Sequence, residues 1–361
     1  SESRREERVM KDKVLLVDDD AMVLAGLKRQ LRNQFRIDTA LNGEEALKQV
    51  QENGPYAVIV SDFMMPSMNG IEFLAHVKKT SPDTVRMMLT GSADMPTAIR
   101  AVNEGNIFQF HPKPCPADIL SQAIQSAIQK YHKVVSHQQQ LNNFKSSLEK
   151  ASKVQHELLP KSDPDFDGFD IAGRSIWCDE TGGDYFDYFS LTNGDLGIVV
   201  ADASEHGVSA ALLMTTVRAL LRQRVTMERD IARIVTDVNH ELARDVAASG
   251  RFMTMFFLKI EPATGTLTWV RAGHEPAILY NAGEDSFHEL TGEGMALGVV
   301  ENLEFQKYTH QAWTPGSIIV VGTDGIRETH NEAGEMFGSD RFREAIRRHA
   351  TKSAEEIQNI I

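Results

Sequence analysis

The sequence has few cysteines, a shortage of basic charge and no long hydrophobic run, and each shortage excludes a class of protein. The 361 residues include two cysteines, Cys115 and Cys178, which form no CxxC pair, so we expect a reducing cytoplasm and no disulfide framework. Lysine and arginine number 38 against 51 aspartates and glutamates, and the net charge of -13 would repel a nucleic-acid backbone. No apolar run reaches the roughly 18 residues that span a bilayer. We therefore expect a cytoplasmic protein that binds neither nucleic acid nor membrane.

What the sequence does have is aspartate at the ends of apolar segments. These segments have the pattern of buried strands, and each one leads into an acid. They are "VLLVDDD" (14–20), "VIVSD" (58–62), "GIVVADASEHG" (197–207) and "IIVVGTDG" (318–325). The pattern predicts that strands deliver carboxylates to one end of a sheet in each half of the chain.

The N-terminal third alternates short apolar runs with amphipathic stretches. Strands are predicted at "KVLLV", "RIDTA", "YAVIV" and "TVRMMLT", and helices at "AMVLAGLKRQL", "GEEALKQV" and "GIEFLAHVKK". This alternation predicts a doubly wound, flavodoxin-like α/β domain over residues 13–118, with a parallel sheet covered by helices on both faces. Residues 1–12 are expected to form a disordered tail.

Residues 119–160 are expected to form a helical linker. Between Ala117 and Leu159 there is no glycine or proline, and apolar or small side chains recur every three or four positions. This spacing predicts one helix roughly 65 Å long, with a shift of the heptad register near Gln138. We expect a parallel two-stranded coiled coil that makes a homodimer; the alternative is a helix folded back on its own domains.

Residues 161–361 are predicted to form an α+β domain built on a β-sandwich. The strand-like segments are "GDLGIVVA", "FMTMFFLKI", "TLTWVRA", "AILYN" and "SIIVVG". Two amphipathic helices, at about 207–224 and 229–247, interrupt them. Strands in runs with a helix pair between them favour a sandwich over a second array of alternating strands and helices.

Three acids of the first domain are predicted to share one crevice. Asp18 and Asp19 end the first strand and Asp62 ends the third, and side chains at the carboxyl ends of parallel strands converge. Three carboxylates repel one another unless a cation lies between them, and oxygen ligands suit Mg²⁺. Thr90 and Lys113 end the next two strands, where they would bond phosphoryl oxygens while Asp62 acts as the nucleophile. The alternative is that these acids cap helices or face solvent.

This part of the chain resembles the response-regulator receiver family over residues 13 to about 130. The motifs "LLVDDD", "SDFMMPSMNG", "MLTGS" and "FHPKP" match that family in order and spacing. The resemblance implies that a histidine kinase phosphorylates Asp62. It also implies that Asp19, Asp62 and the Met64 carbonyl bind Mg²⁺, with help from Asp18.

The same resemblance assigns the residues that respond to phosphorylation. Thr90, Phe110 and Lys113 occupy the positions of the receiver switch. The resemblance further implies that the Lys113–Pro114 peptide bond is cis, in a turn that holds the lysine.

Three acids of the second domain form a comparable set. Asp202 and Asp324 each end an apolar strand, and Asp184 follows two glycines in "TGGDYFDYF". No lysine or hydroxyl accompanies them, so water is the expected attacking group. Two divalent ions about 4 Å apart would lower the pKa of such a water and hold a phosphoryl group.

The second half resembles the PPM (PP2C-like) serine/threonine phosphatases of the SpoIIE/RsbU type over nearly all of residues 156–345. The matching motifs are "GGDYFDYF", "ADASEHGVSAALLM", "RFMTMFF", "RAGHEPAILY", "GMALGV" and "PGSIIVVGTDGIRETHNEAGEMFG". The resemblance implies that Asp202 bridges two Mn²⁺ or Mg²⁺ ions and that the Ala203 carbonyl and Asp324 are further ligands. It gives Asp184 the role of another ligand or of the residue that holds a metal-bound water. It implies as substrate a phosphorylated STAS-domain antagonist of an anti-sigma factor.

Two departures from the family pattern bear on the metal site. Glu205 stands where the family has glycine, and a glutamate is strained there if the position needs a positive φ. The sequence ends at "EEIQNII", before the Asp-Asp pair that closes the family's domain, so we expect an incomplete domain end and a weakened metal site. Glu205, His206 and His274 are candidates for catalytic contact or for support of the ligands. Asp187 is interpreted as an acid of a loop or as one that supports the metal ligands from behind.

Two hypotheses of function follow from these motifs. The first is a two-component response regulator in which phosphorylation of Asp62 controls a metal-dependent protein phosphatase. The alternative is a non-catalytic, phosphorylation-controlled adaptor whose degenerate phosphatase domain binds a sigma-factor regulator.

Overall fold

The computed structural model describes the residues 12–91, 107–177, 179–227, 230–311 and 313–361. The chain divides into two compact units, residues 1–144 and 145–361. Cys178 and nearly all of the expected N-terminal tail lie outside the described residues. Among the helices that are described, none is long and apolar enough to pass through a bilayer.

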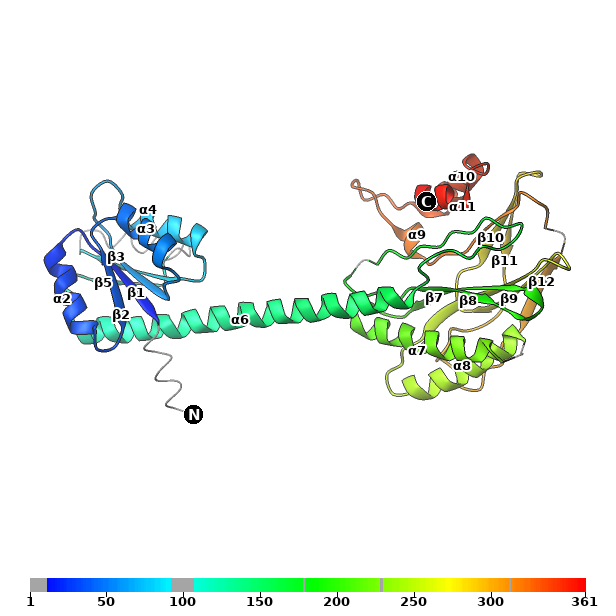
Figure 1. The fold of residues 1–361 in the computed structure, drawn as a ribbon, viewed down its shortest axis with the longest axis horizontal. Helices are drawn as coiled ribbons and strands as arrows, with labels where there is room; N and C mark the ends of the chain where they lie inside the picture. Colours follow the sequence, from blue (N-terminus) through cyan, green and yellow to red (C-terminus); the bar gives the residue numbers. More distant parts are fainter. Residues whose placement is uncertain (1–11, 92–106, 178, 228–229, 312) are drawn as a thin grey trace. The chain divides into compact units, whose positions relative to one another are not determined.

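The first unit contains a parallel five-stranded sheet (Figure 1). Its strand order is β2-β1-β3-β4-β5. The strands are β1 (Lys13–Val17), β2 (Arg36–Ala40), β3 (Val58–Asp62), β4 (Val85–Thr90) and β5 (Gln109–Pro112). The helices between them are α2 (Ala21–Leu31), α3 (Gly43–Asn53) and α4 (Gly70–Thr80). This is the doubly wound fold that the alternating pattern predicted, and Asp62 ends the third strand as expected.

Apolar side chains cover both faces of this sheet. On one face, Leu31 of α2 and Leu120 of the long helix that follows β5 pack with Val60 of β3. On the other face, Phe73 of α4 packs with Ile59 of the same strand. Neighbouring strand residues join opposite clusters because successive side chains of a strand point to opposite faces. With both faces buried, the carboxyl edge of the sheet is where polar side chains can gather.

One continuous helix, α6 (Ala117–Leu158), follows β5 and ends one residue before the predicted limit. Its first turns belong to the first unit, where Leu120 and Ile124 are buried. Farther along, Leu141 and Phe144 are exposed, Phe144 to 64%. The predicted single helix is therefore confirmed, and large apolar side chains lie on its surface.

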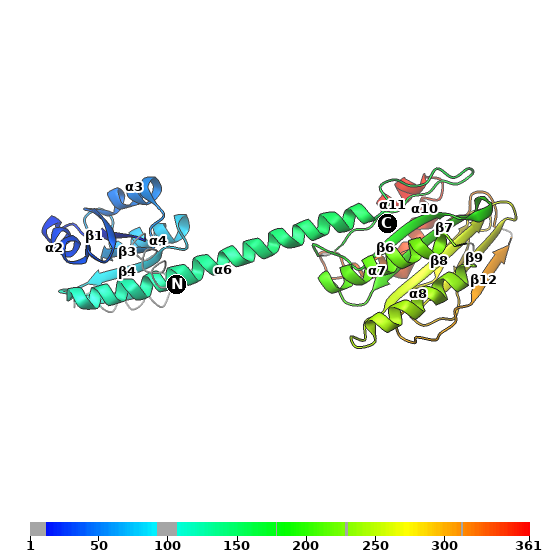
Figure 2. The ribbon, with the colours of Figure 1, turned by 60° about the horizontal axis from the view of Figure 1, so that its bottom comes forward.

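The second unit contains two antiparallel sheets. The larger, whose strands are labelled in Figure 2, has the strand order β12-β9-β8-β7-β6, and the smaller has the order β11-β10-β13. The larger sheet consists of β6 (Tyr185–Ser190), β7 (Leu196–Ala203), β8 (Met253–Glu261), β9 (Thr266–Ala272) and β12 (Lys307–Gln311). The smaller consists of β10 (Ala277–Asn281), β11 (Ser286–Leu290) and β13 (Ile318–Val320). The remaining elements are α7 (Val208–Val225), α8 (Ile231–Val246), α9 (Gly325–Glu328), α10 (Gly338–Arg348), α11 (Ala354–Ile360) and a 3-10 turn, η2 (Thr192–Gly194).

The two sheets pack face to face between layers of helices. Phe256 and Trp269 of the larger sheet meet Leu279 of the smaller one in a shared core. Helices α7 and α8 cover the outer face of the larger sheet, as Figures 1 and 2 show. Phe342 of α10 packs on Ile278, on the outer face of the smaller sheet. The predicted α+β sandwich is confirmed, and the two predicted helices lie within a few residues of their expected limits.

A buried ion pair fastens α7 to the edge strand β6. Asp187 of β6 has no exposed surface, and both of its carboxylate oxygens accept hydrogen bonds of 2.7 Å from Arg222 of α7. The Tyr185 hydroxyl donates a third hydrogen bond to the same carboxylate, at 2.6 Å. A carboxylate can be buried when it is paired and hydrogen-bonded in this way. Of the two interpretations of Asp187, the one that placed it in a loop was wrong: the residue lies inside a strand and supports the packing of a helix.

Candidate functional site

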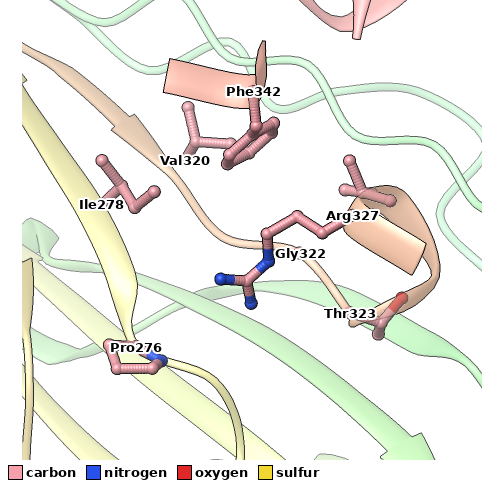
Figure 3. Close-up of a pocket in the computed structure, with 8 residues that line it drawn as sticks. Pro276, Ile278, Val320, Gly322, Thr323, Arg327 and Phe342 are labelled. Atoms are coloured by element: carbon pink, nitrogen blue, oxygen red, sulfur yellow. The ribbon is translucent and has the colours of Figure 1, made fainter. Parts of the chain in front are cut away.

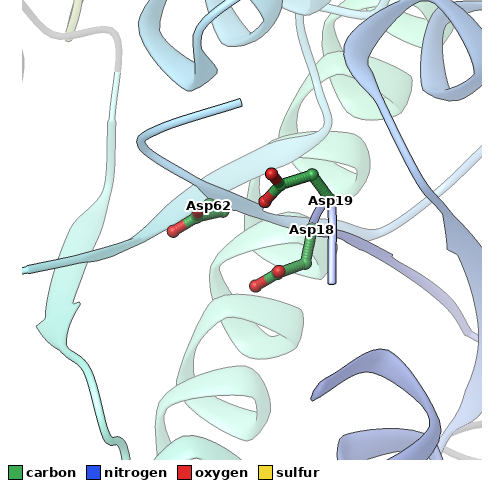
Figure 4. Close-up of side chains that lie close together, drawn as sticks. All are labelled: Asp18, Asp19 and Asp62. Carbon is green, nitrogen blue, oxygen red and sulfur yellow. The ribbon is translucent and has the colours of Figure 1, made fainter. Parts of the chain in front are cut away.

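The first carboxylate cluster lies at the carboxyl edge of the parallel sheet (Figure 4). Asp62 ends β3 and Asp18 follows β1, which is paired in parallel with β3. One oxygen each of Asp18, Asp19 and Asp62 lies within 4.8 Å of the other two. Asp18 and Asp62 are buried, whereas Asp19 is exposed. Sequence reasoning placed these three acids together, and the structure brings them together in an acidic pocket of the kind that suits Mg²⁺.

Lys113 joins this cluster as its cation. Its Nζ lies 2.6 Å from Asp18 Oδ2 and 2.6 Å from Asp62 Oδ1. Burial raises the pKa of Asp62, and the hydrogen bond and charge of Lys113 act against that rise. Burial alone would lower the pKa of Lys113, but its bonds to the two carboxylates hold it above the usual value. The lysine therefore carries a full charge beside the carboxylate that is expected to be phosphorylated.

The other residues that are expected to form the switch lie at the same edge or next to it. Thr90 ends β4, is buried, and donates a 3.2 Å hydrogen bond to the Gly91 carbonyl. Phe110 of β5 is half-buried against the core. The Lys113–Pro114 peptide bond is cis, as expected. The side chain of Met64 is exposed, and the role of its carbonyl as a ligand stays a prediction.

A glycine allows the loop after β3 to return to the backbone of Asp62. A Cβ atom on Gly70 would lie 2.1 Å from the Asp62 carbonyl oxygen. The Gly70 amide also donates a 2.9 Å hydrogen bond to the Phe63 carbonyl. Asn69 caps the helix that begins there and forms a capping box with Glu72. The start of α4 is thereby held against the backbone of Asp62.

The second carboxylate cluster draws acids from both sheets of the sandwich. Asp202 lies near the end of β7, and Asp184 directly precedes the neighbouring strand β6. Asp324 occupies the N-cap position of α9, after β13 of the other sheet. Burial raises the pKa of Asp202 to about 7, together with the charges of Asp184 and Asp324 and a hydrogen bond to Asp184. Burial also raises the pKa of Asp184, and the charge of Asp324 adds to it.

One part of this prediction needs correction. We expected Asp324 to end a buried strand, but β13 ends at Val320, its residues are half-buried, and Asp324 is exposed four positions later. Within the described residues, the acids of this cluster are less tightly gathered than the receiver acids, which alone meet the 4.8 Å spacing. A pair of ions about 4 Å apart spreads its ligands more widely than a single ion does. The looser set is thus compatible with two ions.

Small residues bring the Asp184 loop close to β7. A Cβ atom on Gly183 would lie 3.1 Å from the Ala203 carbonyl oxygen and 3.1 Å from the Ala210 side chain. The Ala203 carbonyl therefore faces this loop, beside Asp184. A larger residue at position 183 would push Asp184 away from Asp202.

The two candidate histidines have different environments. His206 is exposed, with its Nδ1 3.2 Å from Asp179. His274 is buried, and its Nδ1 lies 2.8 Å from Thr254 Oγ1. Burial lowers the pKa of His274 to about 4, so the ring is neutral near pH 7. The Thr254 hydroxyl, which sequence reasoning missed, in turn donates to the Asp202 carbonyl at 3.4 Å. His274 thus reaches the strand that carries Asp202 through Thr254, and the charge of Asp324 acts on it as well.

Glu205 has the backbone conformation that the family glycine suggested. Its φ is +70°, a region that side chains other than glycine rarely adopt. Its carboxylate accepts hydrogen bonds from Arg251 at 3.2 Å and from Ser209 at 3.1 Å. The side chain is thereby directed to Arg251 and Ser209, and the expected strain at this position is confirmed.

We predict that Glu205→Gly stabilises the second unit. Glycine adopts a positive φ without strain, and this alone favours the folded state. Glycine also raises the conformational entropy of the unfolded chain, which offsets part of the gain, so the net increase in melting temperature should be about 2–4 °C. Glu205→Ala is the matched control, because it removes the same carboxylate and keeps the strain. Thermal unfolding followed by circular dichroism measures both. An equal change in the two variants would mean that the carboxylate, and not the backbone, decides the effect.

A small pocket lies next to Asp324 (Figure 3). It is lined by Pro276, Ile278, Val320, Gly322, Thr323, Ile326, Arg327 and Phe342. The guanidinium of Arg327 projects into it and forms an ion pair with Glu275. Sequence reasoning missed Arg327, and its only signal was its position three residues after Asp324.

Comparisons with known proteins agree with this two-part organisation. The family model "Response regulator receiver domain" matches residues 14–125, and the model "Stage II sporulation protein E (SpoIIE)" matches residues 192–361. Phosphoserine phosphatase RsbU of Bacillus subtilis is 28% identical over 218 residues, 60% of this chain and 64% of RsbU. The hydrogenase transcriptional regulatory protein HoxA of Cupriavidus necator is 35% identical over 116 residues, 32% of this chain and 24% of HoxA. The chain thus spans less than two thirds of either relative.

A solved structure supports the fold of the second unit. The SiaA-PP2C domain of Pseudomonas aeruginosa aligns with a TM-score of 0.52 and 23% identity. The alignment covers 61% of this chain and 88% of that domain. At this identity the likeness concerns the fold alone.

Proposed function

We propose that this chain is a metal-dependent phosphoserine or phosphothreonine phosphatase controlled by phosphorylation of Asp62. It joins an N-terminal response-regulator receiver domain to a C-terminal, RsbU-like phosphatase domain of the SpoIIE, PP2C-like type. One observation carries the proposal: Asp184, Asp202 and Asp324 come from both sheets of one sandwich and act on one another electrostatically. We place the receiver at residues 13–118, the linker at 119–160 and the phosphatase domain at 161–361.

The donor set of the second cluster fits divalent ions. Its side chains are carboxylates, and among the described residues the neighbouring charges that act on Asp202 are acidic ones, Asp184 and Asp324. Oxygen ligands of this kind suit Mg²⁺ or Mn²⁺. Asp202 would bridge two ions, with Asp184, Asp324 and the Ala203 carbonyl as further ligands. Two ions would supply an activated water and neutralise charge on the phosphoryl group.

The described side chains around Asp202 leave water as the attacking group. The Thr254 hydroxyl lies between the Asp202 carbonyl and His274, so it is engaged on both sides. His274 is neutral and buried, and His206 is directed to Asp179. The role of the chain is therefore to hold the ligands, while Gly183 allows Asp184 to approach β7 closely.

The receiver supplies the control in this proposal. A histidine kinase would be the phosphoryl donor, and Asp18, Asp19, Asp62 and the Met64 carbonyl would hold one Mg²⁺. A phosphoryl group on Asp62 would take over the bond that Lys113 now makes to that carboxylate. Thr90 ends the adjacent strand β4 and Phe110 lies within β5, and both would respond to the new oxygens.

The exposed stripe of α6 supports a homodimer. Leu141 follows Val134 by seven residues and Phe144 follows Leu141 by three, so these exposed side chains share one face of the helix. A second copy of the same helix in a parallel coiled coil would cover these side chains. Removing apolar surface from water in this way contributes about 25 cal/mol per Å² to the stability of the dimer.

For the substrate, we propose a phosphorylated STAS-domain protein that antagonises an anti-sigma factor. The support is the likeness to RsbU, which is named a phosphoserine phosphatase. A non-catalytic adaptor is the competing function, and the strained Glu205 beside Asp202 is the observation that favours it.

The test is phosphate release from a phosphoserine STAS protein, with the chain untreated or treated with acetyl phosphate. We expect release that needs Mn²⁺ or Mg²⁺, stops with EDTA, returns when metal is added back, and changes after acetyl phosphate treatment. Release that survives EDTA would overturn the metal-dependent mechanism. Binding of the STAS protein without any release in all conditions would support the adaptor instead.

A further inference from the structure

We propose that Gln155 is a positioning residue for the metal ligand Asp184. The inference rests on the proposed function and deepens it: the last turns of α6 would set the affinity of the metal site through one buried amide. Gln155 lies in α6, and it reaches the loop that leads into Asp184. Both belong to the second unit.

The contact is a pair of hydrogen bonds to one backbone residue. Gln155 Nε2 donates to the Gly182 carbonyl at 2.6 Å, and the Gly182 amide donates to Gln155 Oε1 at 3.2 Å. Gln155 is buried, with 4% of its surface exposed. The amide thus bonds both polar groups of Gly182 away from water, and a buried peptide group without such partners is costly.

A second contact holds the same glycine from another side. The rings of His156 and Trp177 are stacked, with their centroids 4.1 Å apart. A Cβ atom on Gly182 would lie 2.2 Å from the Trp177 ring. Gly182 therefore lies between the Gln155 amide and an indole that stacks on the next residue of the same helix. The loop leading to Asp184 is bound to α6 at two adjacent positions.

The end of α6 is itself fixed to the body of the domain. Leu159 is buried in the core between the larger sheet and its helices. Arg218 of α7 donates a 2.7 Å hydrogen bond to the Leu158 carbonyl. These contacts do not involve the Asp184 loop, so they provide a control for the contact that does.

The backbone between Gly182 and Asp184 has little room to move. At Gly183, the residue between them, an added Cβ atom would lie 3.1 Å from Ala203 and from Ala210, which is closer than ordinary van der Waals contact. A shift of Gly182 is therefore passed on to Asp184, whose charge interacts with Asp202. A rotation or axial shift of α6 would move the Gln155 amide and with it a metal ligand.

The experiment compares Gln155→Met with Arg218→Met in the full chain. The first removes both hydrogen bonds to Gly182 and keeps the length of the side chain; the second removes the Leu158 contact only. We expect Mn²⁺ affinity, measured by titration calorimetry, to fall about tenfold in Q155M, as for other residues that orient metal ligands. R218M should keep its Mn²⁺ affinity within about twofold of the parent chain.

A double mutant separates positioning from general stability. In a chain that carries Asp184→Asn, Q155M should cause no further loss of Mn²⁺ affinity, because the ligand that Gln155 orients has already been altered. A full tenfold loss in that background, or unchanged affinity in Q155M itself, would overturn the proposal.

Hydrogen exchange keeps the two proposals distinguishable. In metal-free protein the Gly182 amide should exchange faster in Q155M than in the parent chain or R218M. If the parent chain binds no Mn²⁺, the phosphatase proposal fails, and the exchange result decides alone: faster exchange supports positioning of the loop, and unchanged exchange rejects it.

Discussion

Asp202→Asn is expected to reduce metal-dependent phosphate release to the background of the assay. Asp202 is the central acid of its cluster, since both Asp184 and Asp324 raise its pKa. Asparagine has the same shape and can still hydrogen-bond, but it carries no charge and cannot bridge two cations. Both the activated water and the charge neutralisation that the ions supply would be lost together. Release of phosphate from a phosphoserine substrate, with Mn²⁺ present, measures the effect.

The matched control for this variant is Asp195→Asn. Asp195 lies at the other end of β7, is buried, and pairs with Lys259 at 3.2 Å, so it presents a buried acid of the same sheet outside the cluster. We expect D195N to fold less stably and to keep metal-dependent release. Asp202→Asn with undiminished release would reject the assignment of Asp202 as a ligand. Loss in both variants would point to folding.

The second large effect is expected from Asp62→Asn, which should abolish labelling by acetyl phosphate. Asp62 ends β3 among the other acids, with Lys113 2.6 Å from its carboxylate. An amide is a poor nucleophile and cannot form the acyl phosphate, so no label should appear in the intact-protein mass. The amide removes one negative charge from a crowded cluster, and the fold should therefore be retained.

Asp20→Asn serves as the control for labelling. Asp20 is part of the same "VLLVDDD" segment, and its carboxylate caps α2 by accepting from the Met22 and Val23 amides. Asparagine caps helices equally well. We expect D20N to be labelled like the parent chain. Residual labelling of Asp62→Asn at the level of D20N would mean that another residue is the acceptor.

Local patterns sufficed for much of the fold. The strands that lie inside the sheets have continuous apolar runs, and α6 has no glycine or proline over its length, so these elements were predicted nearly to their ends. The edge strands β11 and β12 were missed because "SFHEL" and "KYTHQ" are half polar and largely exposed. Strand β6 was seen as a motif only, because Asp187 in its middle is neutralised by Arg222, which lies 35 positions away.

The candidate site residues were predicted from their positions at the ends of strands. The site residues that were misplaced or missed do not lie directly at a strand end. Asp18, Asp19 and Asp62 converge because parallel neighbouring strands share one edge, which is a matter of topology alone. Asp324 was harder to place, since its strand stops early and a short helix begins at the acid. No periodicity distinguishes Gln155 from the other polar residues of α6, and its partner Gly182 lies 27 positions away.

The origin of Asp202 and Asp324 in different sheets has a mechanical consequence. Cations bound by these acids would bridge the edges of the two sheets, which otherwise contact each other through apolar side chains. Because the ions bind the native arrangement and not the unfolded chain, they would oppose any displacement of one sheet relative to the other. Metal binding would therefore stabilise the packing of the two sheets, and loss of the metal would weaken it.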